Sequence, residues 1–423
     1  MTVVSLVVLA AVLVGVVRRP WGLPEVAFAL PGALLVLILA VEPWSGARHA
    51  MGELASTVAF LGAVLVLAEV AAAAGLFDAA GQLLARVGNG GEQRLLLAVA
   101  GLAVAVTTVL SLDATVVLFT PVVIHAVRGR RRPVADASLL AVVFLANGGS
   151  LFLPVANLTN LLVVERQHIG FGGFLLRMAL PGLVSVAVIT FACWRVVPRF
   201  SAGKGPAPSG AGAASTTSTS GPSLDSAGRA VAAGLAAVLV GFFVASSLGF
   251  APAVVAIAGA LFLGGGLLIA GRTRAMDLAR AANPGFLTFV FALAVVVDGV
   301  ARHGAGRWLV DRVPTGDGLA ALLVMAGLAA VAANLVNNLP ATLLLLPALH
   351  GQPLALALAA LLGLNIGPNL TYPGSLATLL WRRVVRRDRC EPSAGTFLRT
   401  SAMATPAALG LSVLALWLVT SVA

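Results

Sequence analysis

NIGPNLTYPGSLATLLWRR, residues 365–383, is a break rich in Gly, Pro, Asn, Ser and Thr inside a long apolar run. A second break of the same build, NGGSLFLPVANLTNLLVVER, occupies residues 147–166. The two strings align without a gap, which places Asn147 on Asn365 and Asn160 on Thr378. Two interrupted apolar helices at matching places in two halves are typical of a transporter binding site.

The composition is that of a membrane protein. Of the 423 residues, 59% are hydrophobic and 10% are charged, whereas a soluble domain carries about 25% charged residues. The apolar runs reach the length of about 20 residues that spans a bilayer. The net charge of +11 comes from basic residues in short loops, as the positive-inside rule describes, so no nucleic-acid partner is expected. The first apolar run lacks a charged leader and a cleavage site, and is predicted to be a span rather than a signal peptide.

Ten apolar runs predict membrane-spanning helices in an all-α polytopic protein. They cover residues 2–17, 24–42, 53–75, 134–165, 172–198, 228–248, 251–270, 284–303, 353–381 and 396–420. Two further apolar stretches, 93–127 and 317–349, are too long for one ordinary crossing. Each is broken near its middle, at Ser111-Leu112-Asp113 and at Asn337-Asn338-Leu339-Pro340, without room for a loop. Each is therefore a candidate re-entrant hairpin.

The chain divides into two related halves, residues 1–198 and 228–423. A Gly-, Ser-, Thr- and Pro-rich segment, 199–227, separates them and has the composition of a flexible linker. AFLGAVLVLAEV in the first half resembles FVFALAVVVDGV in the second, which places Glu69 near Asp298. LSLDATVVLFTPVV likewise resembles VNNLPATLLLLPAL. The halves are thus predicted to be structural repeats.

Charge indicates the orientation of the repeats. If the two long stretches each cross the membrane once, Lys and Arg divide almost evenly between the two sides. If each is a hairpin that enters and leaves on one side, 21 of the 27 Lys and Arg residues fall on one side, which is the bias expected of a cytoplasmic face. The hairpin arrangement gives five spans in each half and therefore two inverted repeats. It places both termini on the outer side of the cell membrane and the linker in the cytoplasm.

The hairpin tips and the two breaks are expected to meet around one cavity, because irregular backbone at membrane depth must be buried or line water. Asp113, a carboxylate at the first tip, is functional by default and is the main candidate for proton coupling; the alternative is a helix cap. Glu69 and Asp298 are further candidates for proton coupling or gating. The alternative for these two is a structural cap or an ion pair with a basic residue.

The candidate substrate-binding residues are the amides and hydroxyls of the tips and breaks, which bring donors and acceptors that must be satisfied. They are Asn147, Asn157, Thr159, Asn160, Asn334, Asn337, Asn338, Asn365, Asn369, Thr371, Ser375 and Thr378. The histidines and the two cysteines show no metal-ligand or disulfide spacing, and no nucleotide motif or catalytic constellation occurs. We therefore expect no cofactor, no metal and no enzyme activity, but secondary transport driven by an ion gradient.

Three segments resemble the ArsB-type arsenite efflux permeases of the ion transporter superfamily, which also holds dicarboxylate and citrate carriers and some sodium/proton antiporters. The first is the break at 365–383, which is similar to the C-terminal signature of that family. The second, SLDATVVLFTPVV, is similar to its Asn-Asp-Gly segment ending in Thr-Pro, with Leu112 and Ala114 where Asn and Gly are usual. The third, ANLVNNLPATLLLLPAL, is similar to its Asn-Asn-Met/Leu-Pro segment.

The resemblance implies two inverted repeats of five spans with a hairpin each. It also implies efflux of arsenite and antimonite in exchange for protons by an elevator motion, in some members with a soluble ATPase partner. Arsenite is an uncharged trihydroxide at neutral pH, and neither a tip nor a break contains Arg or Lys. The alternatives are a sodium- or proton-coupled anion carrier of the dicarboxylate type, a sodium/proton antiporter and, in another class, a membrane enzyme. A soluble ATPase partner and a homodimer are both compatible with the sequence.

Overall fold

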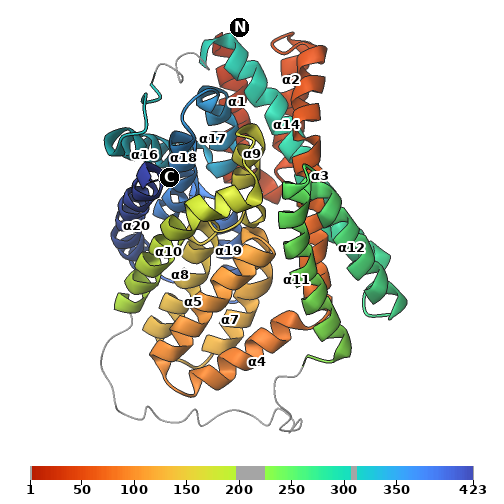
Figure 1. Cartoon of the computed structure of the whole chain (residues 1–423), viewed down its shortest axis with the longest axis vertical. Helices are drawn as coiled ribbons and strands as arrows, with labels where there is room; N and C mark the ends of the chain where they lie inside the picture. Colours follow the sequence, from red (N-terminus) through yellow and green to blue (C-terminus); the bar gives the residue numbers. More distant parts are fainter. Residues whose placement is uncertain (1, 197–223, 306–311, 423) are drawn as a thin grey trace.

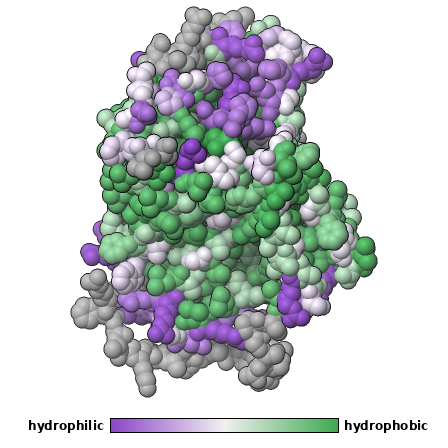
Figure 2. Space-filling view, viewed as in Figure 1, coloured by the Kyte–Doolittle hydropathy of each residue, from purple (hydrophilic) through white to green (hydrophobic). Residues whose placement is uncertain are grey.

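The computed structural model describes residues 2–196, 224–305 and 312–422. These residues are almost entirely helical and contain no strand. Eight of the described helices are long and apolar enough to cross a membrane. Figure 2 shows a hydrophobic band across the middle of the molecule and hydrophilic surfaces at its two ends. The prediction of an all-α, multi-pass membrane protein is confirmed.

Figure 1 shows how the helices of the two halves are arranged. The first half contains α1 (Thr2–Arg18), η1 (Pro20–Gly22), α2 (Val26–Ile38), α3 (Trp44–Ala73), α4 (Leu76–Gly88), α5 (Glu92–Val109), α6 (Leu112–Ala114), η2 (Thr115–Phe119), α7 (Thr120–Val127), α8 (Arg132–Gly148), η3 (Pro154–Ala156), α9 (Leu158–Arg166) and α10 (Phe171–Val196). The second contains α11 (Ser226–Ser247), α12 (Pro252–Ile269), α13 (Ala275–Ala281), α14 (Pro284–Val300), η4 (Ala301–Ala305), α16 (Leu319–Val336), α17 (Asn338–Leu345), η5 (Leu346–Leu349), α18 (Leu354–Ile366), η6 (Gly367–Leu370), η7 (Tyr372–Gly374), α19 (Leu376–Arg387) and α20 (Ala394–Val422).

The two long apolar stretches each fold into helices joined by a tip of two residues in the first hairpin and one residue in the second. Ser111 joins α5 to α6 with φ 137° and ψ 167°, and Asn337 joins α16 to α17 with φ 78° and ψ 154°. One residue with positive φ reverses the chain here, so no loop is needed. Figure 1 shows α5 and α7 in the lower half of the molecule and α16 and α17 in the upper half. Two inverted repeats require such an arrangement, although the inverted relation itself stays a prediction.

Each break separates a buried helix from a second helix that restarts at a side-chain cap. Asn157 Oδ1 accepts a hydrogen bond from the Thr159 amide at 3.2 Å and begins α9. Ser375 Oγ accepts one from the Thr378 amide at 3.2 Å and begins α19. Asn and Ser are preferred at this position because they satisfy an amide that the helix leaves unpaired. Asn157 and Ser375 are equivalent in the repeat alignment, so both halves restart in the same way.

Small residues let the second broken helix lie directly on the second hairpin. A Cβ atom added at Gly363 would lie 2.2 Å from the Ala326 carbonyl oxygen of α16. A Cβ atom added at Gly367 would lie 2.5 Å from the Ala330 Cβ of the same helix. Close approach of membrane helices through glycines four residues apart is a common packing mode. It fixes the second hairpin to the second break.

We call α1, α2, α3 and α14 the scaffold helices, and the two hairpins with the two broken helices the hairpin body. The scaffold helices share one apolar cluster, whose buried residues include Val36, Val58 and Leu293. Four leucines of the hairpin body pack into the same cluster, and we call them the leucine layer. They are Leu158 and Leu162 of α9 with Leu339 and Leu343 of α17. The leucine layer therefore joins the two parts of the molecule.

Two short helices and several boundaries differ from the sequence predictions, among them the start of α3, which lies at Trp44 rather than at residue 53. The short helices α4 and α13 were not predicted, because neither is an apolar run long enough to be a span. Most of the predicted linker, residues 199–223, lies outside the described residues, as do Arg199, Lys204 and Arg307 of the charge comparison. The last residues of the predicted linker belong to α11, which begins at Ser226 with Asp225 as its cap.

Candidate transport site

Both hairpin tips and both breaks line one small cavity, which we call the central cavity. Its volume is about 40 Å³, enough for a molecule of a few heavy atoms, since one water needs roughly 10–15 Å³ on this measure. Three residues of α1 and α14 line it together with residues of all four segments. The lining residues are Val16, Leu112, Asp113, Asn157, Leu158, Thr159, Phe286, Phe289, Asn337, Asn338, Leu339, Pro340, Leu376 and Ala377.

The central cavity offers one carboxylate and several neutral polar groups. No Lys, Arg or His is among the described residues that line it. Asn337 Nδ2 donates a hydrogen bond to the Pro373 carbonyl oxygen at 3.0 Å. Asn338 Oδ1 accepts one from the Leu339 amide, also at 3.0 Å. Within the described chain the Asn337 oxygen and the Asn338 nitrogen have no further partner, so both are available to a ligand. This chemistry suits a small uncharged polar molecule.

Asp113 stands at the junction of the central cavity and a larger cleft. The larger cleft, of about 390 Å³, lies at the α4 end of the molecule and is also lined by Arg19, Glu25, Glu69 and Arg280. The hairpin cap is Ser111, whose Oγ accepts from the Ala114 amide at 3.3 Å. The Asp113 carboxylate has no ion pair or hydrogen bond in the described part of the chain. Glu69 lines the same larger cleft.

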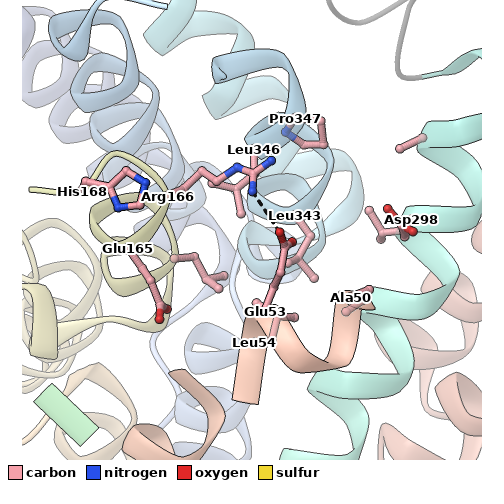
Figure 3. Close-up of a pocket in the computed structure, with 14 residues that line it drawn as sticks. Ala50, Glu53, Leu54, Glu165, Arg166, His168, Asp298, Leu343, Leu346 and Pro347 are labelled. Carbon is pink, nitrogen blue, oxygen red and sulfur yellow. Dashed lines mark hydrogen bonds and ion pairs between the residues drawn. The ribbon is translucent and has the colours of Figure 1, made fainter. Parts of the chain in front are cut away.

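Asp298 lies on the other side of the molecule, away from the central cavity. Its Oδ2 atom accepts from Arg302 Nε at 2.9 Å, and the same nitrogen lies 3.2 Å from Glu42 Oε2. Asp298 lines a third cleft, of about 300 Å³, together with Glu53 and other residues of α3, α9 and α17 (Figure 3). Glu69 thus lines the same cleft as Asp113, whereas Asp298 lines a different one. The arrangement of Asp298 is that of an ion pair.

Most of the predicted substrate ligands bond to one another across the two breaks. Asn365 Oδ1 accepts from Asn157 Nδ2 at 2.7 Å and from Thr159 Oγ1 at 2.8 Å. Asn365 Nδ2 donates to Asn160 Oδ1 at 2.6 Å. Every one of these side chains is buried. One residue of the second break therefore satisfies three side chains of the first.

The reciprocal contact occurs at Asn147, the equivalent of Asn365 in the first break. Asn147 Nδ2 donates to Thr378 Oγ1 at 3.2 Å and to Asn369 Oδ1 at 2.9 Å. Asn369 Nδ2 in turn donates to the Phe144 carbonyl oxygen at 3.0 Å. Because Thr378 is the repeat equivalent of Asn160, each break binds the other through the same pair of positions. We call this set the amide cluster: Asn147, Asn157, Thr159, Asn160, Asn365, Asn369 and Thr378.

Asn334 and Thr371 connect the second hairpin to the second break. Thr371 Oγ1 donates to Asn334 Oδ1 at 2.7 Å. Asn334 Nδ2 donates to the Gly367 and Ala330 carbonyl oxygens, both at 2.8 Å. Neither Asn334 nor Thr371 lines the central cavity. Of the predicted substrate ligands, only Asn157, Thr159, Asn337 and Asn338 line it.

Sequence reasoning missed the apolar walls of the central cavity. Phe286 and Phe289 come from α14, and Val16 comes from α1. These residues belong to ordinary apolar runs, so no local signal marks them. It also missed Ser150, whose carbonyl oxygen accepts from Asn160 Nδ2 at 2.6 Å and whose hydroxyl accepts from Asn157 Nδ2 at 3.4 Å. Ser150 lies inside the first break and could have been found there.

Polar contacts join α9 to α3 beside the third cleft. Arg166 Nη1 lies 3.3 Å from Glu53 Oε1 (Figure 3). Thr57 donates a hydrogen bond to Glu165. Together with the leucine layer, these contacts close the hairpin body against the scaffold helices on this side. In the described part of the chain, no group of three or more His, Cys, Asp or Glu residues is placed to hold a metal ion.

Comparison with known proteins identifies the family. Residues 2–364 match the family model for citrate transporters, CitMHS. This chain belongs to the citrate transporter family. It is therefore a transporter of the predicted superfamily rather than an enzyme.

Similar proteins in this family include several arsenical pumps. The arsenical pump membrane protein of Escherichia coli K12 is 28% identical over 95% of both chains. That of Yersinia enterocolitica is 28% identical over 87% of both chains. An uncharacterized transporter of Mycobacterium tuberculosis is 25% identical over 92% of both chains. The resemblance to arsenite efflux permeases, predicted from the sequence, is confirmed.

One solved structure shares the fold. The crystal structure of the Alcanivorax borkumensis YdaH transporter, described as having an unusual topology, covers 90% of both chains with a TM-score of 0.60. Its sequence is 20% identical. The likeness supports the helical transporter fold of this family member.

Proposed function

We propose that this transporter exports arsenite and antimonite in exchange for protons. The observation that carries the proposal is the central cavity, in which one unpaired carboxylate, Asp113, lies among neutral amides and a hydroxyl. An uncharged trihydroxide needs donors and acceptors rather than a countercharge. The arsenical pumps similar to this chain over nearly its whole length support the same substrate.

In this proposal the four polar residues of the cavity besides Asp113 contact the substrate. They are Asn157, Thr159, Asn337 and Asn338. Asp113 is protonated when the site is without substrate and loses its proton to the cleft at the α4 end. The remaining members of the amide cluster hold the two breaks together and so fix the shape of the site. Glu69 passes protons between Asp113 and the mouth of that cleft.

Transport proceeds by an elevator motion of the hairpin body against the scaffold helices. The cavity reaches the α4 end past Phe286 and Leu376, which line both the cavity and the adjoining cleft. Toward the α9 end it is closed by the leucine layer. By the positive-inside rule the α4 end is cytoplasmic, so the conformation is inward-facing. The proposal places both termini outside the cell membrane and treats residues 1–198 and 228–423 as the two inverted repeats.

The test is arsenite uptake into everted membrane vesicles with an imposed pH gradient. Asp113→Asn is expected to lower gradient-driven uptake at least 10-fold, since a neutral side chain carries no proton at that position. Asp317→Asn makes the same chemical change at an exposed acid and is expected to behave as wild type. If Asp113→Asn keeps uptake that responds to the pH gradient, the coupling role of Asp113 is wrong.

An anion carrier is the second candidate, because the matching family model is that of citrate transporters. Such a carrier, coupled to sodium or protons, would bind carboxylates through amides and helix N-termini, since no cation is among the described residues that line the cavity. The two candidates differ in what stabilises the purified protein. A rise in melting temperature with citrate or with sodium, but not with arsenite, would favour the anion carrier.

A further inference from the structure

Helix α19 carries two pairs of arginines in different environments. Arg382 Nε lies 2.7 Å from Glu391 Oε1, and Arg386 Nε lies 2.7 Å from Glu391 Oε2. Arg383 and Arg387, each one residue further along, point to another face of the helix and make no ion pair in the described part of the chain. The first pair of charges is neutralised within the protein, whereas the second pair is not.

The unpaired arginines line a cleft between α7 and α19. The cleft has a volume of about 380 Å³. Arg128, which ends α7, contributes a third guanidinium, and His125 lies on the same helix. Asp388 is the one carboxylate among the described lining residues, and it forms no ion pair with the three arginines. The cleft is therefore strongly cationic and suited to bind an anion.

One wall of this cleft is apolar and open to the surroundings. It is formed by Val117, Pro121, Ile124 and Val384. Val117 is 43% exposed, although it belongs to a hairpin that enters the membrane. The arginines lie in or directly after the C-terminal parts of α7 and α19. A ligand that fits both parts has a negatively charged head and an apolar chain.

The cleft also adjoins the scaffold helices. Val117 lines both this cleft and the one that leads to Asp113. Arg19, in the loop after α1, has its pKa lowered to about 10 by burial and then by the nearby Arg383 guanidinium. Arg19 also forms an ion pair with Glu25, so two like charges, one of them paired, lie near each other at the boundary between scaffold and hairpin body. An anion beside Arg383 would reduce this repulsion and stabilise the observed conformation.

We propose that the cleft between α7 and α19 binds the phosphate headgroup of an anionic membrane phospholipid. Guanidinium groups pair well with phosphate oxygens, and basic pockets between membrane helices at the cytoplasmic side bind acidic lipid headgroups. Free phosphate shares the headgroup chemistry, but the exposed apolar wall favours a lipid. The inference concerns a site apart from the central cavity and does not require that arsenite be the substrate.

The experiment measures lipid retention by native mass spectrometry and melting temperature in a neutral detergent. The purified chain is mixed with phosphatidylglycerol, phosphatidylcholine or inorganic phosphate. Phosphatidylglycerol alone is expected to be retained and to raise the melting temperature. Arg383→Gln/Arg387→Gln is expected to weaken its binding roughly 10- to 30-fold, since each basic residue near an anionic lipid contributes to affinity.

The matched control is Arg86→Gln/Arg94→Gln, which also removes two arginines from the α4 end but none from the cleft. It is expected to retain phosphatidylglycerol as the wild type does. Arg128→Gln tests the site from α7, in case the double variant fails to fold. Three results would overturn the proposal: undiminished retention by the cleft variants, equal stabilisation by phosphatidylcholine, or full stabilisation by inorganic phosphate. None of these readouts depends on transport, so the test of the lipid site is independent of the test of the proposed function.

Discussion

At the residue scale, Asn365 bonds to more side chains than any other member of the amide cluster. Asn365→Ala removes a hydrogen bond from three buried atoms of the first break. Thr159 Oγ1 and Asn160 Oδ1 then have no partner in the described chain, and Asn157 Nδ2 keeps only Ser150 Oγ at 3.4 Å. Because each unpaired buried polar group costs about 1–3 kcal/mol, the variant is expected to lose roughly 3 kcal/mol or more of stability. Asn147→Ala leaves Asn369 Oδ1 unpaired, whereas Thr378 Oγ1 keeps Ser375 Oγ at 3.5 Å, so this variant is expected to lose less.

The measurement for the amide cluster is the melting temperature of each variant in detergent. Asn89→Ala, at an exposed position after α4, serves as the control and is expected to melt as the wild type does. The order expected is therefore Asn365→Ala lowest, then Asn147→Ala, then Asn89→Ala. Equal melting of all three variants would mean that the cluster does not hold the breaks together.

Glu42 makes stability depend on pH. It lies in the loop between α2 and α3, where burial, followed by the Asp298 carboxylate, raises its pKa from 4.5 to about 7, while Arg302 opposes the shift. The folded protein thus binds this proton more tightly than the unfolded chain. The stability from Glu42 is complete below pH 4.5 and is lost as the pH rises through about 7.

The melting temperature of the wild type is therefore expected to fall between pH 4.5 and pH 7 more steeply than that of Glu42→Gln. Asp317→Asn, an exposed acid far from this ion pair in sequence, is expected to leave the slope unchanged. Curves for wild type and Glu42→Gln that run parallel over this range would contradict the assignment.

Sequence reasoning at the residue scale located the polar groups but not their partners. Asp113, Asn337 and Asn338 were predicted as candidates, and the structure places all three at the central cavity. The pairing of Asn147 with Thr378 and of Asn365 with Asn160 was not predicted. A repeat alignment gives equivalent positions, whereas contacts between repeats depend on how the two breaks cross in space.

At the element scale, both hairpins turn at a residue whose backbone favours glycine. Ser111 and Asn337 adopt φ and ψ values in a region that is nearly exclusive to glycine and costs other residues about 1–3 kcal/mol. At both positions, the glycine variant is therefore expected to be more stable than the alanine variant. The alanine variants lose the side-chain hydrogen bond and keep the strain.

The control for the hairpin tips is Gln82 on the exposed face of α4. There the order should reverse, because glycine is about 1 kcal/mol worse than alanine inside a helix. Melting temperatures of the three glycine–alanine pairs check the prediction. If alanine is the better residue at Ser111 and Asn337 as well, the tips are not strained.

Most of the elements could be predicted from the sequence, because a long apolar run in a membrane protein indicates a helix. The predicted span 251–270 corresponds to α12 (Pro252–Ile269), and 172–198 corresponds to α10 (Phe171–Val196). The helix α4 (Leu76–Gly88) was missed because it is amphipathic, with Asp78 and Arg86 at its ends. A search for spans does not detect a helix whose polar face meets water.

At the scale of the whole molecule, the hairpin body meets the scaffold helices at three kinds of contact. The central cavity has walls from both parts, since Phe286 and Phe289 line it together with Asn337 and Asn338. The leucine layer seals it on the α9 side. The pair Arg166 and Glu53 adds an ion pair between α9 and α3. An elevator motion must break all of these contacts in each cycle.

A reversible cross-link between α3 and α9 tests this motion. Cysteines replace Glu53 and Arg166 in a chain with Cys193→Ser and Cys390→Ser, and a short bifunctional thiol reagent joins them. Because the hairpin body must leave α3 in an elevator cycle, uptake is expected to stop on cross-linking and to return on reduction.

The matched control replaces Arg382 and Glu391. Their Nε and Oε1 atoms are 2.7 Å apart, and both residues belong to one part of the molecule. Cross-linking this control pair is expected to leave uptake unchanged, because α19 and the loop after it move together. Full uptake by a completely cross-linked pair at 53 and 166 would show that substrate crosses without separation of α9 from α3, and a fixed-site gating mechanism would replace the elevator.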